Sequence, residues 1–317
     1  MKQQPWRRLP SAYALPGTLQ PRITDVDRWQ HLNNVAQIGL HGEALQQWLL
    51  ATLGPDAWRG AVDGLALPPG AHLALQANAT DFLAEAYYPA PLATGVRLLA
   101  VDDAGFTVGS ALFQHGTCVG LHQARLGLWA DGQPLALAPP LQASLQARLQ
   151  AVAAAQPAVA GDASAADTGA ALLPSHAHTH PDHWPWQISI NARFADADAL
   201  GQTSDHTLAR CAEQARVQFL TRVFGANRVT EPVGFMVAHV ALRWHRRQPA
   251  PQAWQVGIGV QRVGERSMAV RSALFDGDSC LAESNSVMVV IDQATRRPSA
   301  LPEASRTALA PYLLPGA

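Results

Sequence analysis

One short segment, DVDRWQHLNN (25–34), holds side chains that could act on a carbonyl group. Asp27 lies just before a predicted helix and His31 at its mouth, with Asn33 and Asn34 entering the first turn. A helix N-terminus has unpaired backbone N–H groups and a positive dipole end, which suit a developing oxyanion. A carboxylate there can act as a nucleophile or as a general base for water, and a histidine can orient a carbonyl or move a proton. The segment therefore predicts chemistry at a carbonyl carbon.

A structural interpretation of the same residue types stays open. A second segment, DADALGQTSD (196–205), keeps both acids but lacks the histidine and the asparagines. Asparagine, serine and aspartate are common helix N-caps, and acids before a helix stabilise its dipole. Taken alone, each of these residues is better explained as a helix cap than as a catalytic residue. The presence of a histidine within a duplicated acidic turn favours the catalytic interpretation. Further along the first helix, Glu43 lies among apolar residues, which would raise the pKa of its carboxyl group.

The chain contains an internal repeat. Aligning Asp27 with Asp198 also pairs Gly54 with Gly225. Downstream, the strings PAP and SALF, the second followed by a cysteine, recur in the same order. Collinear matches in three blocks indicate that one unit was duplicated.

Each half has the same pattern of predicted elements. An extended segment leads to the acidic turn, and a helix with one apolar face follows. Each helix ends at a glycine, as a left-handed C-cap requires. Strand-like runs come next, with hairpin signals at FQHGT and FDGDS. The pattern predicts an α+β fold, β-α-β-β-β-β twice, with a mostly antiparallel sheet and one central helix in each unit.

The expected boundaries are an N-terminal unit over 12–135, a linker over 136–185, a C-terminal unit over 186–302 and a tail over 303–317. The linker begins with an Ala-rich surface helix and continues as a segment too poor in bulky apolar residues to pack. It ends in HAHTHPDHWPW, whose alternate histidines could hold a metal ion. The Pro-flanked context favours a solvated linker, so no metal site is predicted. The histidines of this segment are His176, His178, His180 and His183.

Composition excludes several classes of function. The net charge of −1 and pI of about 6.9 argue against an electrostatic nucleic-acid binder. Lys2 is the only lysine, so anions must be held by arginine, histidine or backbone N–H groups. Three arginines in LRWHRRQPAP could bind the phosphate groups of a ligand, although a solvated strand end is the commoner explanation. These are Arg243, Arg246 and Arg247.

The remaining bulk features favour a cytoplasmic protein. The three cysteines are odd in number and far apart, which fits a reducing compartment. The N-terminus lacks the apolar core of a signal peptide, and no run approaches the length of a membrane span. We therefore expect a soluble cytoplasmic protein without a membrane partner.

The first acidic segment and its helix resemble the thioesterase signature of the hotdog superfamily. DVDRWQHLNNVAQIG with a later glutamate is similar to acyl-ACP thioesterases. FADADALG with CAEQAR, and the strands from VGERSMAV to PSALP, resemble the 4-hydroxybenzoyl-CoA thioesterase type. The resemblance covers about 12–135 and 186–302. It implies two tandem hotdog units, no metal or other cofactor, and hydrolysis of acyl-CoA or acyl-ACP at sites between hotdog units.

The resemblance also assigns roles by position. Asp27 and Asp198 match the catalytic aspartate in the two copies, and both are expected to face the region between the units. Trp29 departs from the asparagine of acyl-ACP enzymes, and Gln37 from their usual tyrosine. The first copy therefore holds the fuller set and the second the minimal one. Further matching positions are His31, Asn33, Asn34 and Glu43 in the first copy, and Glu213 and Arg216 in the second.

These observations predict an acyl thioester hydrolase that releases a carboxylic acid from acyl-CoA or acyl-ACP. Chains of this kind could pair as homodimers. A non-catalytic acyl-thioester binding protein is the alternative that the substitutions at Trp29 and Gln37 favour. A hotdog dehydratase or hydratase ranks last, because DRWQH lacks the Asn-Pro that those enzymes carry.

Overall fold

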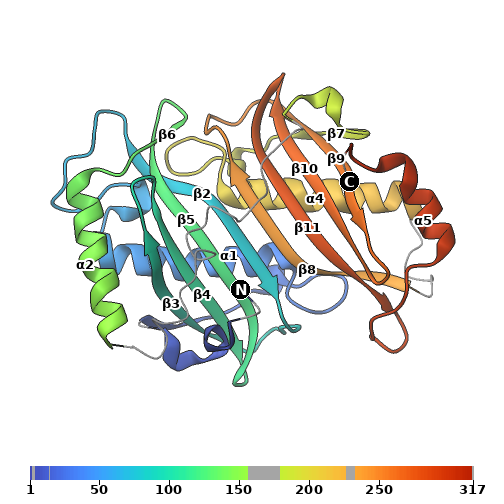
Figure 1. Ribbon diagram of the computed structural model, residues 1–317, viewed down its shortest axis with the longest axis horizontal. Helices are drawn as coiled ribbons and strands as arrows, with labels where there is room; N and C mark the ends of the chain where they lie inside the picture. Colours follow the sequence, from blue (N-terminus) through green and yellow to red (C-terminus); the bar gives the residue numbers. More distant parts are fainter. Residues whose placement is uncertain (2–3, 14, 156–178, 226–232, 316–317) are drawn as a thin grey trace. The chain divides into compact units, whose positions relative to one another are not determined.

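The computed structural model describes residue 1 and residues 4–13, 15–155, 179–225 and 233–315. Its contacts divide the chain into two compact units, Met1–Leu172 and Leu173–Ala317, which we call the N-terminal and C-terminal units. Each consists of an antiparallel sheet with one long helix against it, α1 in the first and α4 in the second (Figure 1).

The N-terminal unit has the predicted order of elements. Its sheet has the strand order β1-β3-β4-β5-β2, antiparallel throughout, and the short β6 pairs with β5. A second helix, α2, follows the sheet. The elements are β1 (Leu15–Leu19), α1 (Asn34–Leu53), β2 (His72–Phe82), β3 (Leu92–Val101), β4 (Phe106–Gln114), β5 (Thr117–Ala130), β6 (Gln133–Leu135) and α2 (Pro139–Ala155), with 3-10 turns at Pro5–Arg8, Pro10–Ala12, Ile23–Asp25 and Ala57–Arg59.

The C-terminal unit repeats this arrangement. Its sheet has the order β7-β9-β10-β11-β8, which is the N-terminal order strand for strand. The predicted α+β fold of two β-α-β-β-β-β units is therefore confirmed. The elements are β7 (Trp186–Asn191), α4 (Asp205–Phe224), β8 (Val233–Trp244), β9 (Ala253–Val263), β10 (Ser267–Asp276), β11 (Ser279–Asp292) and α5 (Glu303–Leu309), with 3-10 turns at Pro181–His183, Phe194–Asp196 and Ala310–Tyr312.

Strand register preserves the duplication residue by residue. Ser110 pairs with His122 across β4 and β5, and Ser272 pairs with Ser284 across β10 and β11. Both hairpins have a bulge directly after the leucine of SALF. A one-residue slip would exchange the buried and exposed faces of a strand, so the equal register means that equivalent positions face the helix in both units.

The helix ends differ in one detail from the sequence prediction. Gly54 and Gly225 follow α1 and α4 with φ of 104° and 81°, as expected for a residue that only glycine tolerates well. Their ψ values, 173° and 167°, lie far from the left-handed helical region. These glycines therefore occupy an extended positive-φ region that is almost exclusive to glycine, and the predicted left-handed cap geometry is wrong.

The apolar face of α1 packs into the main core of the N-terminal unit. Leu45, Trp48 and Leu49 are buried there, and the Trp48 ring lies 6.2 Å from that of Phe106 on β4. The expected helix at the start of the linker is present as α2, and its Leu145 is fully buried in the same core. Burial of each such side chain contributes about 1.5–3 kcal/mol, so α2 is part of the structure that holds α1 in place.

The C-terminal unit encloses Phe219 of α4 in a similar way. Its ring lies 6.0 Å from that of Trp186 and 5.1 Å from that of Tyr312, which follows α5. Leu309 and Leu314 are also buried, so the chain after residue 302 packs against this unit. The flexible part of the predicted linker, with His176 and His178, lies outside the described residues.

Candidate acidic-turn site

A buried carboxylate builds the turn that precedes α1. Asp25 accepts the Arg22 backbone N–H at 2.7 Å and its guanidinium at 2.9 Å. The Asp25 carbonyl accepts the Asn33 N–H at 2.8 Å, which closes the loop between them. The first acid of the motif is therefore structural, and its role is to present the residues between 25 and 33.

Asp27 lies inside this loop with its carboxylate held on both sides. Its Oδ1 accepts the Trp29 backbone N–H at 2.8 Å, and its Oδ2 lies 3.6 Å from His31 Nδ1. The Asp27 and His31 side chains are 20% and 18% exposed, so both are partly accessible. The structure thus brings together Asp27 and His31, the two residues that the sequence most strongly suggests for chemistry at a carbonyl group.

The oxygens around His31 Nδ1 favour one tautomer of the ring. Nδ1 lies near two oxygens, the Asp27 carboxylate and, at 3.3 Å, the Leu32 carbonyl. Both oxygens can only accept, so in the neutral ring Nδ1 carries the hydrogen and Nε2 has the free lone pair. An acid that orients the protonated side of a histidine leaves the opposite nitrogen able to take a proton from water.

The C-terminal unit has the same loop without the histidine. Asp198 Oδ1 accepts the Leu200 N–H at 2.8 Å and the Gln202 N–H at 2.9 Å. Asp196 takes the structural role of Asp25, because its carboxylate is bonded by Arg193 and, at 2.8 Å, by Arg210. Burial opposes ionisation there, but these bonds and charges hold the pKa of Asp196 below its ordinary value. Among the residues that the structure describes, Asp198 accepts hydrogen bonds from turn backbone alone.

The paired asparagines divide their roles. Asn33 is the N-cap of α1, and its side-chain oxygen accepts the N–H of Val35 at 2.7 Å and that of Ala36 at 3.4 Å. Those N–H groups are therefore occupied by the cap, contrary to the expectation that they would be unpaired. Asn34 is the first helical residue and lies beside the mouth of the loop. The positive end of the α1 dipole still favours negative charge at this point.

The helix glutamates lie in different surroundings. Glu43 is exposed, so the expectation that it lies among apolar neighbours is wrong. Glu213 is half-buried and lies near Arg216, whose guanidinium is buried and donates to Ser286 Oγ at 3.0 Å. Burial lowers the pKa of Arg216, and the charge of Glu213 opposes this shift. The two residues of the E-x-A-R motif thus meet inside the C-terminal unit.

The three candidate phosphate-binding arginines do not form one cluster of equivalent groups. Arg247 is 3% exposed, forms an ion pair with Asp205 at the start of α4, and stacks on Trp244 at 4.8 Å. The guanidinium of Arg247 therefore has a structural role. Arg243 is half-buried on β8 and Arg246 is exposed, so a phosphate contact stays a prediction for these two.

Sequence reasoning missed a buried histidine pair behind the loop. His41 lies within the apolar face of α1, and its ring stacks on His122 of β5 with 4.9 Å between centroids. His41 Nδ1 lies 2.8 Å from Ser110 Oγ, and His122 Nδ1 lies 2.7 Å from Thr80 Oγ1. A histidine within an apolar helix face was the available signal. Its partners could not be named without the sheet register.

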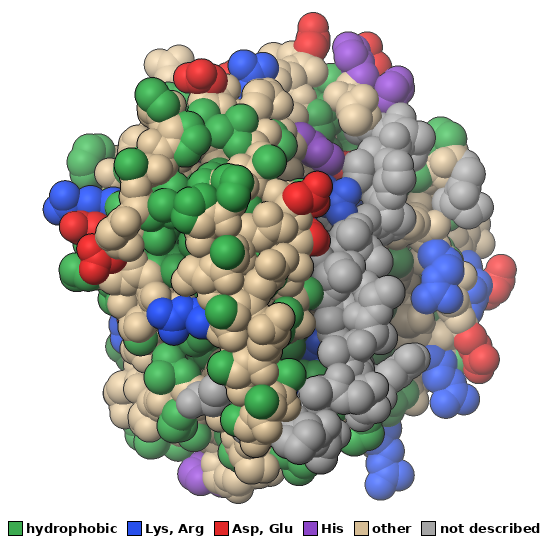
Figure 2. Space-filling view, turned by 60° about the vertical axis from the view of Figure 1, so that its left-hand side comes forward, with side chains coloured by type: hydrophobic (Ala, Val, Ile, Leu, Met, Phe, Trp, Pro, Cys, Tyr) green, Lys and Arg blue, Asp and Glu red, His purple; other side chains and the backbone are tan. Residues whose placement is uncertain are grey.

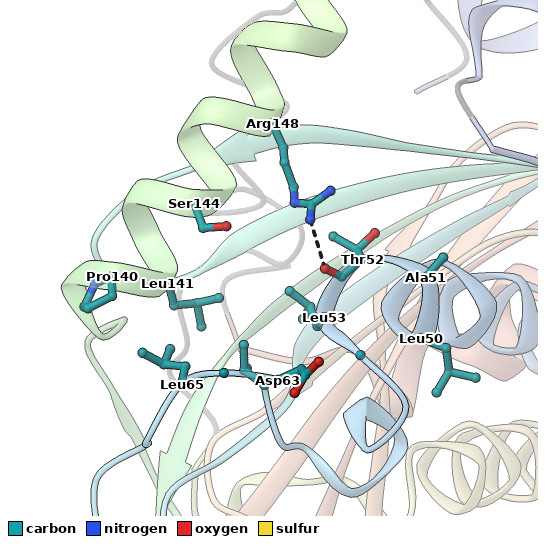
Figure 3. A pocket seen from close by; sticks show the side chains of 13 residues that line it. Leu50, Ala51, Thr52, Leu53, Asp63, Leu65, Pro140, Leu141, Ser144 and Arg148 are labelled. Atoms are coloured by element: carbon teal, nitrogen blue, oxygen red, sulfur yellow. Dashed lines mark hydrogen bonds between the residues drawn. The ribbon is translucent and has the colours of Figure 1, made fainter.

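A pocket of about 480 Å³ lies at the other end of α1. It is formed by the last turn of α1, the loop at 62–65 and α2 (Figure 3). Arg148 reaches from α2 and donates to the Thr52 carbonyl at 3.2 Å. A helix of this length spans about 30 Å, and the pocket contains none of the predicted site residues. The chemistry we expect is therefore at the N-terminal end of α1.

Three properties concern the described residues as a whole, namely metal-binding clusters, membrane-spanning helices and surface charge. No group of three or more metal-binding side chains occurs among them. Likewise, no helix in the described ranges is long and apolar enough to cross a membrane. On the face shown in Figure 2, apolar and uncharged atoms predominate, and charged groups of both signs are scattered among them.

Comparisons with solved structures identify the class of fold. An acyl-ACP thioesterase from Bacteroides thetaiotaomicron is 11% identical, with a TM-score of 0.55, and the match covers 86% of this chain and 97% of that one. A 12:0-ACP thioesterase from Umbellularia californica is 10% identical, with a TM-score of 0.61 and coverage of 90% and 94%. At these identities the likeness shows the fold alone, and that fold is the double hotdog.

A match to a protein-family model covers less of the chain than these structures do, but it names a family. Residues 192–309 match the model of the thioesterase-like superfamily, which covers most of the C-terminal unit. A search of curated proteins found no significant match. The family match and the fold together confirm the resemblance to the hotdog thioesterase superfamily in its tandem form.

Proposed function

We propose that the protein hydrolyses an acyl thioester at the Asp27 loop and releases a carboxylic acid and a thiol. The observation that carries the proposal is the Asp27–His31 pair, with 3.6 Å between Oδ2 and Nδ1, at the N-terminal end of α1. The thioesterase-like match of residues 192–309 supports the reaction class. CoA and an acyl-carrier protein both remain candidate thiol carriers.

The contacts support a general-base mechanism. Asp27 orients His31, and His31 Nε2 takes a proton from a water molecule as the water oxygen attacks the thioester carbonyl. The positive end of the α1 dipole stabilises the negative charge that develops on the carbonyl oxygen. The C–S bond then breaks, and the departing thiolate receives the proton from His31. Atoms balance as acyl thioester plus water giving acid plus thiol.

The two units contribute unequally in this proposal. Gln202 stands where His31 stands in the N-terminal unit, and Asp198 is bonded to two turn N–H groups. Without an imidazole, its carboxylate would have to act on water alone. We therefore assign the main activity to the N-terminal loop and a smaller contribution to Asp198.

Thiol release tests the proposal directly. A set of aliphatic and aromatic acyl-CoAs, and the same acyl groups on carrier protein, would be assayed with a thiol reagent. We expect Asp27→Asn to lower kcat by about 10²–10⁴-fold, and Asp198→Asn to lower it less.

A matched control separates chemistry from turn formation. Asp292 accepts the Thr295 N–H at 2.7 Å in a comparable turn at the end of β11, so Asp292→Asn should keep the wild-type rate. Wild-type turnover in both Asp27→Asn and Asp198→Asn would refute the proposed site. Saturable acyl-thioester binding with no thiol release would instead establish the non-catalytic alternative.

A further inference from the structure

Two polar residues on the sheet-facing side of α1 distinguish the units. Gln37 and His41 are 5% and 0% exposed, whereas the equivalent positions of α4 hold the buried apolar residues Leu208 and Ala212. Burying an amide and an imidazole in a core costs free energy that apolar residues avoid. Because the C-terminal unit folds without them, this cost is not required by the hotdog fold.

Gln37 connects α1 to the loop that carries His31. Its Nε2 donates to the Leu32 carbonyl at 3.0 Å, and the same carbonyl lies 3.3 Å from His31 Nδ1. The N–H of the same peptide group belongs to Asn33 and donates to the Asp25 carbonyl at 2.8 Å. The peptide group after Leu32 is thus held in one orientation, with its oxygen toward His31.

His41 is a fully buried neighbour of Gln37 on α1. The two residues are one helical turn apart on the same face of α1. An atom added at the Cβ position of Gly120 would lie 3.0 Å from His41 Nε2 and 3.7 Å from Gln37 Oε1, so both side chains reach the same point on β5. The His41 ring is fixed by Ser110 and by the stacked His122. The Gln37 amide and the fixed His41 ring therefore border the same glycine of β5.

We propose that Gln37 is a positioning residue for His31. It aims the Leu32 carbonyl at His31 Nδ1, which keeps the hydrogen on Nδ1 and the lone pair on Nε2. His41, which is fixed by Ser110 and His122, lies beside Gln37 on that side of α1. This inference rests on the proposed function, because it gives His31 the role of base.

The duplication supplies a replacement that the fold accepts. Gln37→Leu installs the residue of the C-terminal unit, and Gln37→Met keeps the length of the side chain but removes its N–H donor. For either variant we expect kcat for thiol release to fall by about 10-fold to 100-fold, with KM changed less than twofold. The pH profile of kcat/KM should also change, because the His31 ring loses an aligned acceptor.

A second readout does not depend on turnover. The 15N chemical shifts of His31 report which ring nitrogen is protonated, and we expect the wild-type ring to hold its hydrogen on Nδ1. In Gln37→Met the two tautomers should become mixed. Leu208→Met, at the equivalent buried position of α4, is the control and should change neither the tautomer nor the pH profile.

The outcomes separate this inference from the proposed function. Thiol release by the wild type with an unchanged rate, pH profile and His31 tautomer in both Gln37 variants would overturn the positioning role alone. Absence of thiol release by the wild type would overturn the proposed function, and the tautomer measurement would still decide whether Gln37 orients His31.

Discussion

The buried histidine pair predicts how stability depends on pH. Burial lowers the pKa of His122 to about 3, and burial together with the charge of His122 lowers that of His41 well below its ordinary value. Their side-chain hydrogen-bond partners, Thr80 and Ser110, are neutral. In the unfolded chain a histidine titrates near 6.5. Because the folded pKa is depressed, stability is fully present above about pH 6.5 and is lost as pH falls toward 3.

The size of the effect follows from the His122 shift. Between pH 8 and pH 5, the unfolded chain takes up this proton while the folded chain does not, which removes about 2 kcal/mol of unfolding free energy. His41 adds a loss in the same direction. The double variant His41→Ala with His122→Ser installs the residues found at the equivalent positions, Ala212 and Ser284. Its stability should therefore fall less over this pH range than that of the wild type.

Urea unfolding followed by tryptophan fluorescence at pH 8, 7, 6 and 5 measures this difference. We expect the wild type to lose at least about 2 kcal/mol more than the double variant between pH 8 and pH 5. His180, whose side chain is 45% exposed, provides the control: His180→Ala should follow the wild-type curve. Parallel curves for the wild type and the double variant would refute the assignment of two buried neutral histidines.

Two further predictions concern the loop and the second helix. Gln30 has φ of 67°, and the equivalent residue of the C-terminal loop, Gly201, has φ of 75°. Gln30→Gly should therefore stabilise the chain by about 1 kcal/mol, and Gly201→Gln should destabilise it by a similar amount, as measured by the urea midpoint. Effects of the opposite sign would contradict the loop geometry. Leu145→Ala should cost about 2–5 kcal/mol, because this α2 side chain is fully buried, while Ser144→Ala on the pocket side of α2 should change stability little in the same assay. Equal midpoints for the two α2 variants would show that α2 is not part of the core.

The local patterns of the chain were sufficient to predict its elements. Apolar spacing located both long helices, and turn residues located the hairpins after β4 and β10. Asp27 and His31 could be paired in advance because they are four positions apart in one tight loop. Patterns of this kind depend on neighbours in sequence, which stay neighbours in the fold.

The sequence alone determined the two β-α-β-β-β-β units and singled out the acidic turn, because both follow from short-range residue spacing and from the repeat; the assignment to the hotdog superfamily rested on the resemblance of its motifs. Only the tertiary structure decided which polar residues support that turn. Arg247, which follows β8, forms an ion pair with Asp205 of α4, and His41 of α1 stacks on His122 of β5. Both contacts depend on how the sheet is placed against its helix. Such contacts join residues far apart in the chain, and a strand's register depends on the packing of the whole sheet. The roles of Gln37 and His41 are for this reason a property of the folded unit.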